Sequence, residues 1–178
     1  MCPELEQTLM EIDSATNGMS DEQLAWHPEA KWSTGDILEH LSRAFAGTVA
    51  GLQKALEKNS PRKREPTLRE RVRVLLVVEF GYMPTGTKSP EVARPQGIPP
   101  RVAFNAIREN LVALDLPLAA CERQFGSSTK LLAHPILGPM TVRQWRKLHW
   151  VHTRHHMRQV RALREQMQGA KSFKLHDG

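Results

Sequence analysis

Apolar residues recur every three or four positions through most of the chain, which is the spacing of a helix that buries one face. This spacing predicts four long helices, over residues 4–17, 33–57, 100–125 and 141–168. A further apolar pattern over residues 67–82 predicts a short, well-buried helix between the second and the third of them. The alternation typical of strands is missing, so the sequence predicts an all-α fold, a four-helix bundle with this short helix in its crossover.

Two of the long helices begin with residues that can satisfy the free N–H groups of a first turn. Ser33 is followed three residues later by Asp36, and Thr141 by Gln144, so each pair can form a capping box. Inside the third helix, Pro117 lacks a backbone donor and is expected to kink or split the helix. The capping signals place two helix starts next to Ser33 and Thr141.

Segments rich in proline, glycine or charge separate the helices. Residues 84–100 are so rich in proline and glycine that they predict a long loop in the crossover, which can shape the mouth of a site. Residues 58–64 form a basic polar linker, and residues 169–178 are expected to fray. We therefore predict one domain over residues 1–178, with its helical core at about 4–168.

The last predicted helix concentrates histidines, because four of the chain's eight occur within residues 149–156. His152 and His156 are four residues apart, so their side chains point the same way from successive turns and can bind one ion. Both lie on a stripe with Trp145 and Leu148. A lone histidine would be expected on the surface of this basic helix, but burying an imidazole without a partner costs roughly 1–3 kcal/mol, and here two would be buried. We therefore predict a metal-binding or catalytic role for the pair.

A third ligand has to come from elsewhere in the chain, since one helix cannot easily supply three. His40 interrupts the apolar stripe of the second predicted helix, one turn after its start. The alternative is a buried histidine satisfied by one hydrogen bond, which is the commoner case for a histidine considered alone. The need of the pair for a partner favours His40 as the third ligand. Three histidines leave a divalent ion an open position, as in catalytic sites.

Five further polar residues lie near the predicted ligands in the sequence. Asp36 and Glu39 can orient a ligand ring or act as a base, but we favour capping and solvation as their roles. Gln159 lies on the ligand stripe and can hold a water or a substrate, or serve as a packing residue. His149 and His155 flank the stripe and can contact the ligands. The candidate catalytic residues are Gln159, His149 and Asp36.

The remaining histidines and both cysteines are assigned other roles. His27 precedes a proline in a predicted loop, His134 is expected to tether a turn, and His176 lies in the tail. Cys2 and Cys121 show no pairing logic, which suits a reducing cytoplasm.

The charge of the chain bears on its partners. Lys and Arg total 25 against 19 Asp and Glu, a net charge of +6 that attracts anionic substrates mildly. Nucleic acid is permitted but not indicated, because no aromatic residue interleaves with the basic residues of 58–64. The acidic N-terminus does not resemble an export signal, and the longest apolar run, 74–83, is too short to span a membrane.

Three stretches resemble the DinB-like superfamily of small four-helix metal-binding proteins. They are WSTGDILEHL at 32–41, HTRHHMRQV at 152–160 and HPILGPMTVRQW at 134–145, the last similar to the HPxxGxxTxxxW link of one branch of that superfamily. The resemblance covers most of residues 4–168 in helix order. By this match the family's ligands are the histidine of the first stretch and the first and last histidines of the second, the same three that the spacing selects.

The resemblance implies an up-down-down-up bundle, a homodimer in many members, and a bound zinc, nickel or other divalent ion. Some members are transferases or isomerases that use small thiols. We therefore predict a metal-dependent enzyme that activates a low-molecular-weight thiol or water to act on a small molecule, as a thiol transferase or a hydrolase. The alternative is a binding module for a metal or small ligand, of stress-response type and without turnover.

Overall fold

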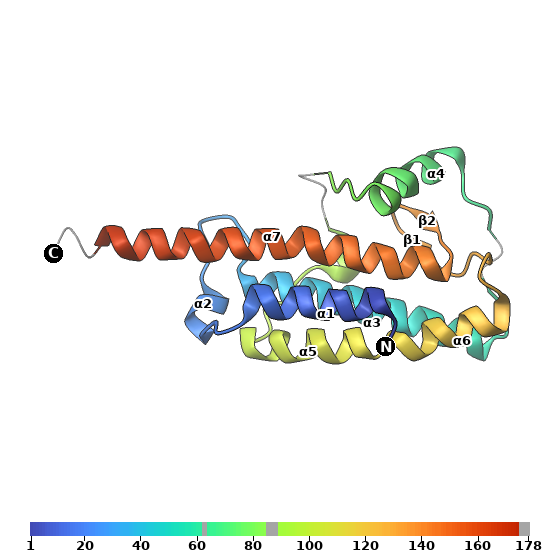
Figure 1. Ribbon diagram of the computed structural model, residues 1–178, viewed down its shortest axis with the longest axis horizontal. Helices are drawn as coiled ribbons and strands as arrows, with labels where there is room; N and C mark the ends of the chain where they lie inside the picture. The colour runs from blue at the N-terminus through green and yellow to red at the C-terminus, as the bar shows by residue number, and fades with distance from the viewer. Residues whose placement is uncertain (62–63, 85–88, 175–178) are drawn as a thin grey trace.

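The computed structural model describes residues 1–61, 64–84 and 89–174, and most of them are helical, as predicted (Figure 1). None of the described helices is both long and apolar enough to cross a membrane. The α-helices are α1 (Pro3–Thr16), α2 (Asp21–Ala25), α3 (Thr34–Glu57), α4 (Leu68–Val74), α5 (Pro100–Val112), α6 (Asp115–Phe125) and α7 (Val142–Lys174).

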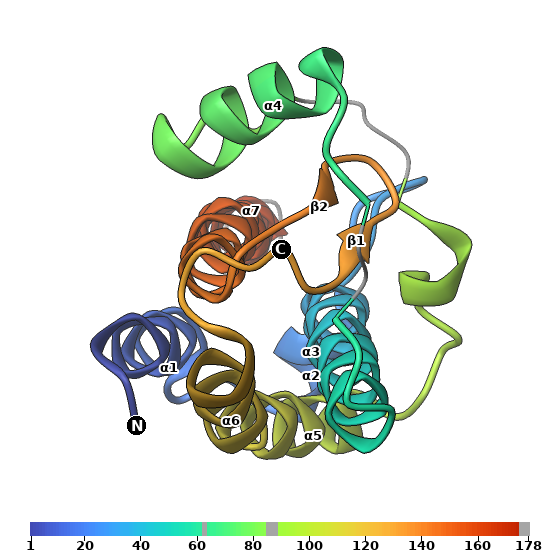
Figure 2. The ribbon, with the colours of Figure 1, turned by 90° about the vertical axis from the view of Figure 1, so that its right-hand side faces the viewer.

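The long helices lie side by side along the long axis of the molecule. Figures 1 and 2 show α1, α3, α7 and the consecutive pair α5 and α6 around a common interior, with α3 packed on α5 and α1 packed on α7. The apolar stripes seen in the sequence meet there and supply most of the free energy of burial. Fully buried members of this core include Leu5, Ile12, Leu41, Phe45, Leu52, Ile107, Leu111, Leu118, Met157 and Val160.

Both predicted capping boxes are confirmed. The Ser33 hydroxyl accepts a hydrogen bond from the Asp36 N–H at 3.0 Å, and the Asp36 carboxylate accepts one from the Ser33 N–H at 2.9 Å. The Thr141 hydroxyl and the Gln144 amide oxygen form the same pair of bonds, both with backbone N–H groups, at the start of α7. These bonds fix the residues at which α3 and α7 begin. They therefore fix the position of every side chain along the two helix axes.

Two predicted boundaries were wrong, and the connection before the last helix contains a short β-hairpin that the all-α prediction lacked. The third predicted helix breaks at Ala113 and Leu114 rather than at Pro117, which lies in the first turn of α6, where a missing N–H is harmless. The last helix continues beyond its predicted end to Lys174, although residues 175–178, with His176, lie outside the described part. Two short strands, β1 (Ala133–His134) and β2 (Gly138–Pro139), pair antiparallel in the connection before α7.

The prediction of a well-buried helix over residues 67–82 was also wrong. The helix forms as α4 and continues as a π-helix over Leu75–Glu79, but it lies outside the bundle, over α7 and the hairpin (Figure 2). Only its inner side is covered, so apolar residues on the other sides remain in solvent. Val74 and Val78 are buried, whereas the exposed apolar residues are Leu68, Val72, Leu75, Leu76 and Phe80.

The segment after residue 88 crosses the first turns of α3. It contains a 3₁₀ helix at Glu91–Ala93, and it is fastened by Glu39, whose carboxylate accepts hydrogen bonds from the N–H groups of Gln96, Gly97 and Ile98 at 2.8–3.2 Å. Glu39 is 2% exposed, so the expected solvated role was wrong. Parts of the predicted linker and loop, residues 62–63 and 85–88, lie outside the described residues.

We expect Glu39→Ala to lower the free energy of unfolding by about 1–3 kcal/mol, because three backbone donors lose a charged acceptor. Glu57→Ala, at an exposed position near the end of the same helix, serves as the control. Hydrogen exchange measures the local effect, which should be faster exchange at residues 96–98. Unchanged protection of these amides in Glu39→Ala would contradict this role.

Candidate metal centre

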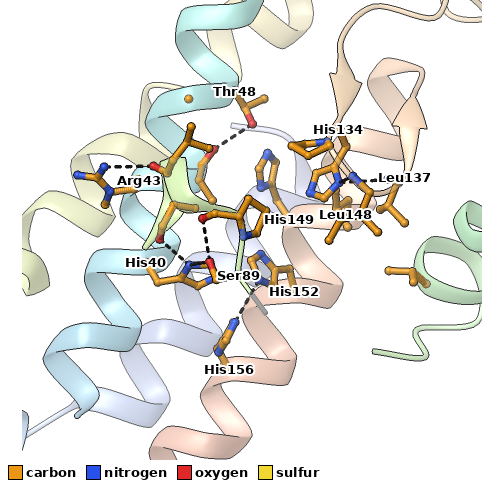
Figure 3. Close-up of a pocket in the computed structure, with 18 of the residues that line it drawn as sticks. His40, Arg43, Thr48, Ser89, His134, Leu137, Leu148, His149, His152 and His156 are labelled. Atoms are coloured by element: carbon orange, nitrogen blue, oxygen red, sulfur yellow. Dashed lines mark hydrogen bonds between the residues drawn. The ribbon is translucent and has the colours of Figure 1, made fainter. Parts of the chain in front are cut away.

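The three predicted ligands meet at the wall of a large cavity. His40 comes from α3, His152 and His156 come from α7, and all three line a cavity of about 1950 Å³ (Figure 3). The helices α3 and α7 pack antiparallel, so the first turns of α3 lie beside the middle of α7. Residues 112 positions apart in the chain are thereby brought into contact.

The Nε2 atoms of the three imidazoles converge. Nε2 of His152 lies 3.2 Å from Nε2 of His40 and 3.1 Å from Nε2 of His156. Nitrogen ligands at about 2.05 Å from a tetrahedral zinc ion lie about 3.3 Å apart, so the observed separations match a shared ion. These three residues could hold a metal ion.

The outer nitrogens of two of these rings are held by hydrogen bonds. Nδ1 of His40 lies 2.8 Å from the carbonyl oxygen of Ala93, and the hydroxyl of Ser89 is 3.3 Å away. A carbonyl oxygen can only accept, so Nδ1 carries the proton and Nε2 presents its lone pair. Nδ1 of His156 donates in the same way to the amide oxygen of Gln159 at 2.8 Å. Such outer hydrogen bonds orient metal-binding histidines.

The convergence leaves a surplus of lone pairs. His40 and His156 both direct a lone pair at His152, which has at most one proton on Nε2 and can donate to only one of them. A cation in their midst would be attracted to all three nitrogens. The chemistry of the donor set therefore fits a divalent metal ion better than it fits a network of hydrogen bonds alone.

Burial keeps these imidazoles neutral. It lowers the pKa of His40, a change that the bond to Ala93 partly offsets, and it lowers the pKa of His156 to about 3. The pKa of His152 is held well below 6.5 by burial and by the neighbouring histidines. Since a neutral imidazole is the form that binds metal, the three are ready to act as ligands at neutral pH.

Of the three candidate catalytic residues, Gln159 and His149 line the cavity and Asp36 does not. Asp36 is engaged in the capping box and does not line the cavity, so its favoured role as a cap is confirmed. Gln159 lines the cavity and links two rings, accepting from Nδ1 of His156 and facing Nε2 of His155 at 3.1 Å with its amide nitrogen. His149 lines the cavity one turn before His152.

His149 is buried without a hydrogen-bond partner. Its ring is 2% exposed, neither nitrogen has a partner among the described residues, and it packs between Phe45 and Trp145. Burial lowers its pKa to about 3. It is therefore a neutral imidazole whose donor and acceptor are both unused.

His134 tethers its turn, as predicted. Its Nδ1 accepts hydrogen bonds from the N–H groups of Ile136 and Leu137, which leaves the proton on Nε2, and burial lowers its pKa to about 4. The residue also lines the cavity. His27 is exposed and bonds to the neighbouring Pro28 carbonyl, consistent with its predicted place in a loop.

Sequence reasoning missed the residues that hold His40. Ala93 contributes only a backbone carbonyl, and Ser89 lies in a loop whose path over α3 depends on the buried Glu39. Backbone groups leave no signature in composition or spacing. The one available signal was the proline-rich loop itself, which was expected to shape the mouth of a site.

Comparison with known proteins places the chain in a family. It belongs to DUF1569, a family described as proteins of unknown function, whose model matches residues 3–163. It is 25% identical over 175 residues to the uncharacterized protein YuaE of Bacillus subtilis (strain 168), a match that covers 90% of this chain and 95% of that protein. No solved structure matches it. The family match includes all three converging histidines.

We expect His149→Phe to raise the free energy of unfolding at pH 7 by about 1 kcal/mol, because it removes two buried polar atoms that have no partner. Below pH 6.5 the unfolded wild type gains a proton at this residue, and the folded state does not until about pH 3. The wild type should therefore lose stability faster on acidification than the variant, by about 1.4 kcal/mol per pH unit. Urea unfolding between pH 7 and 4.5 measures both effects.

The control for this experiment is Leu116→Phe, at an exposed apolar position outside the cavity. Its unfolding should follow the pH dependence of the wild type, because no titratable group is removed. Equal slopes for His149→Phe and the wild type would show that His149 takes up its proton in the folded protein over the same pH range as in the unfolded chain, contrary to its burial.

Proposed function

We propose that the protein binds one divalent metal ion, zinc or nickel, through His40, His152 and His156. The observation that carries this proposal is the convergence of three buried or half-buried Nε2 atoms, two of them with lone pairs fixed by hydrogen bonds on the opposite side of the ring. An ion bound by three neutral histidines retains its charge and an open position.

The proposed fold is the up-down-down-up bundle of the DinB-like superfamily, formed by one domain. Its support is that α1 and α7 run one way along the long axis while α3 and the pair α5 and α6 run the other way (Figure 1). The resemblance of the three histidine-bearing stretches supports the same assignment. We also propose that the protein is a cytoplasmic homodimer and that it binds neither a membrane nor nucleic acid.

The proposed activity is that of a metal-dependent enzyme that activates a small thiol or a water molecule. A divalent ion supplies the charge that lowers the pKa of either group. The chain orients its ligand rings through Ala93 and Gln159 and encloses the reacting groups in the cavity. Neither cysteine lines that cavity, so the thiol would be an added small molecule.

We expect the protein to contain about one divalent ion per chain, and His40→Ala, His152→Ala and His156→Ala each to reduce that content strongly, because two histidines alone do not complete a site. His155→Ala, on the same helix and beside Gln159, is the matched control. Metal analysis of the purified variants gives the answer. Full metal content in all three ligand variants would disprove the assignment.

The reaction is tested with cobalt in place of the native ion. Titration with 2-mercaptoethanol should produce a sulfur-to-metal charge-transfer band if a thiol occupies the open position, and the band should weaken as the pH falls, because protons compete with the metal for the thiolate. Ethylene glycol, which lacks sulfur, is the control. If no small thiol changes the cobalt spectrum while the metal stays bound, the thiol reaction is wrong and hydrolysis or binding without turnover remains.

A further inference from the structure

The cavity continues from the three histidines along one face of α3. The residues of α3 on this face are small after His40: Ala44, Gly47, Gly51 and Ala55 all line the cavity. A side chain at Gly47 would meet no atom within 4 Å of its Cβ, so the floor of the cavity is open there. These positions recur every three or four residues and therefore share one face of the helix. At Gly51 the cavity narrows, because the Leu132 side chain would lie 2.8 Å from an added Cβ.

The floor leads to a second, charged end. Lys58 also lines the cavity and lies 18 residues after His40, which is about 27 Å along a helix that rises 1.5 Å per residue. Lys54 lies on the flank of the same face, and Arg73 lines the cavity from α4, where it donates to the Ile136 carbonyl of the hairpin connection. The cavity is thus elongated, with the three ligand histidines toward one end of α3 and Lys54 and Lys58 toward the other.

Acidic side chains are missing from this lining. Asp and Glu make up 19 of 178 residues, yet none of the described residues that line the cavity is acidic. Among the ion pairs of the described residues, none involves Lys54, Lys58 or Arg73. The other cationic residues of the lining are Lys31, Arg43 and Arg94. They lie toward the histidine end, since Arg43 donates to the Val92 carbonyl and Arg94 follows Ala93.

Unused polar groups lie between the two ends. His149 is 2% exposed and lines the cavity from α7, and both of its ring nitrogens lack a partner. His134 lines the same wall from the hairpin, with its proton on Nε2. Because the ring nitrogens of His149 have almost no accessible surface, the polar group that this wall offers to the middle of a long ligand is the N–H of His134.

We propose that the cavity binds an elongated organic anion, with its carboxylate or phosphate at Lys54, Lys58 and Arg73, and its body along the small residues of α3. A polar group in the body faces His134, and the opposite end points toward the three histidines. This proposal rests on the proposed function only where it concerns a reaction at the three histidines. The anion-binding end is independent of any metal.

Isothermal titration calorimetry with decanoate and decyl phosphate tests this, using decan-1-ol as the neutral match. The anions should bind one per chain and at least about fivefold more tightly than the alcohol, the ratio that 1 kcal/mol of charge interaction gives. The titrations are made on the protein as purified and again after chelation. Affinity that is lost on chelation is then assigned to binding of the anion to a metal ion. Absence of saturable binding by both anions, or equal affinity for the alcohol, overturns the proposal.

Variants locate the binding site. Lys54→Gln and Arg73→Gln should each weaken decanoate binding by about twofold to fivefold, whereas Arg123→Gln, an exposed charge outside the cavity, should not. Gly47→Trp should place an indole in the path of the ligand and weaken binding strongly, while leaving the helical circular dichroism and the metal content unchanged. Equal weakening by Arg123→Gln, or full binding by Gly47→Trp, also overturns the proposal.

His40→Ala separates the two proposals. It should lose the metal and keep decanoate binding after chelation. If it keeps the metal, the metal assignment fails and the anion site does not. If the wild type holds its metal but binds no anion, the anion site alone fails.

Discussion

The geometry of the candidate site depends on one hydrogen bond, from Nδ1 of His40 to the carbonyl of Ala93. It fixes which nitrogen of His40 faces α7, and it holds only because the segment that supplies the carbonyl is fastened to the same helix by Glu39. A buried carboxylate is costly to desolvate, and three backbone donors offset that cost. The position of a loop and the protonation of a ring are therefore coupled.

The same cavity combines two environments that attract different chemistry. At the histidine end, burial favours neutral imidazoles and hence a cation among them. Toward the other end, Lys54 and Lys58 line the cavity and none of its described lining residues is acidic, which favours an anion. The proposed ligand would place its anionic group there and its other end toward the histidines, so it would be held in one direction.

The sequence predicted the parts that depend on local spacing. His152 and His156 share a face because they are four residues apart, and Ser33 caps α3 because Asp36 follows at the right distance. Features that depend on backbone groups far away in the sequence were not predictable. Glu39, for example, is buried because the N–H groups of residues 96–98 need an acceptor. The exposed side of α4 was misjudged for a related reason. Periodicity shows that a helix has an apolar face, but not how much of that face a neighbour covers.

The attachment of the loop has an evolutionary consequence. Glu39 binds only backbone N–H groups, and His40 meets only the backbone of Ala93, so both bonds survive replacement of the side chains that the loop displays. Val92 and Arg94, which line the cavity, can therefore change without disturbing the ligand that the loop holds. The side chains that line the cavity can therefore diversify at these positions while the arrangement of the three histidines stays constant.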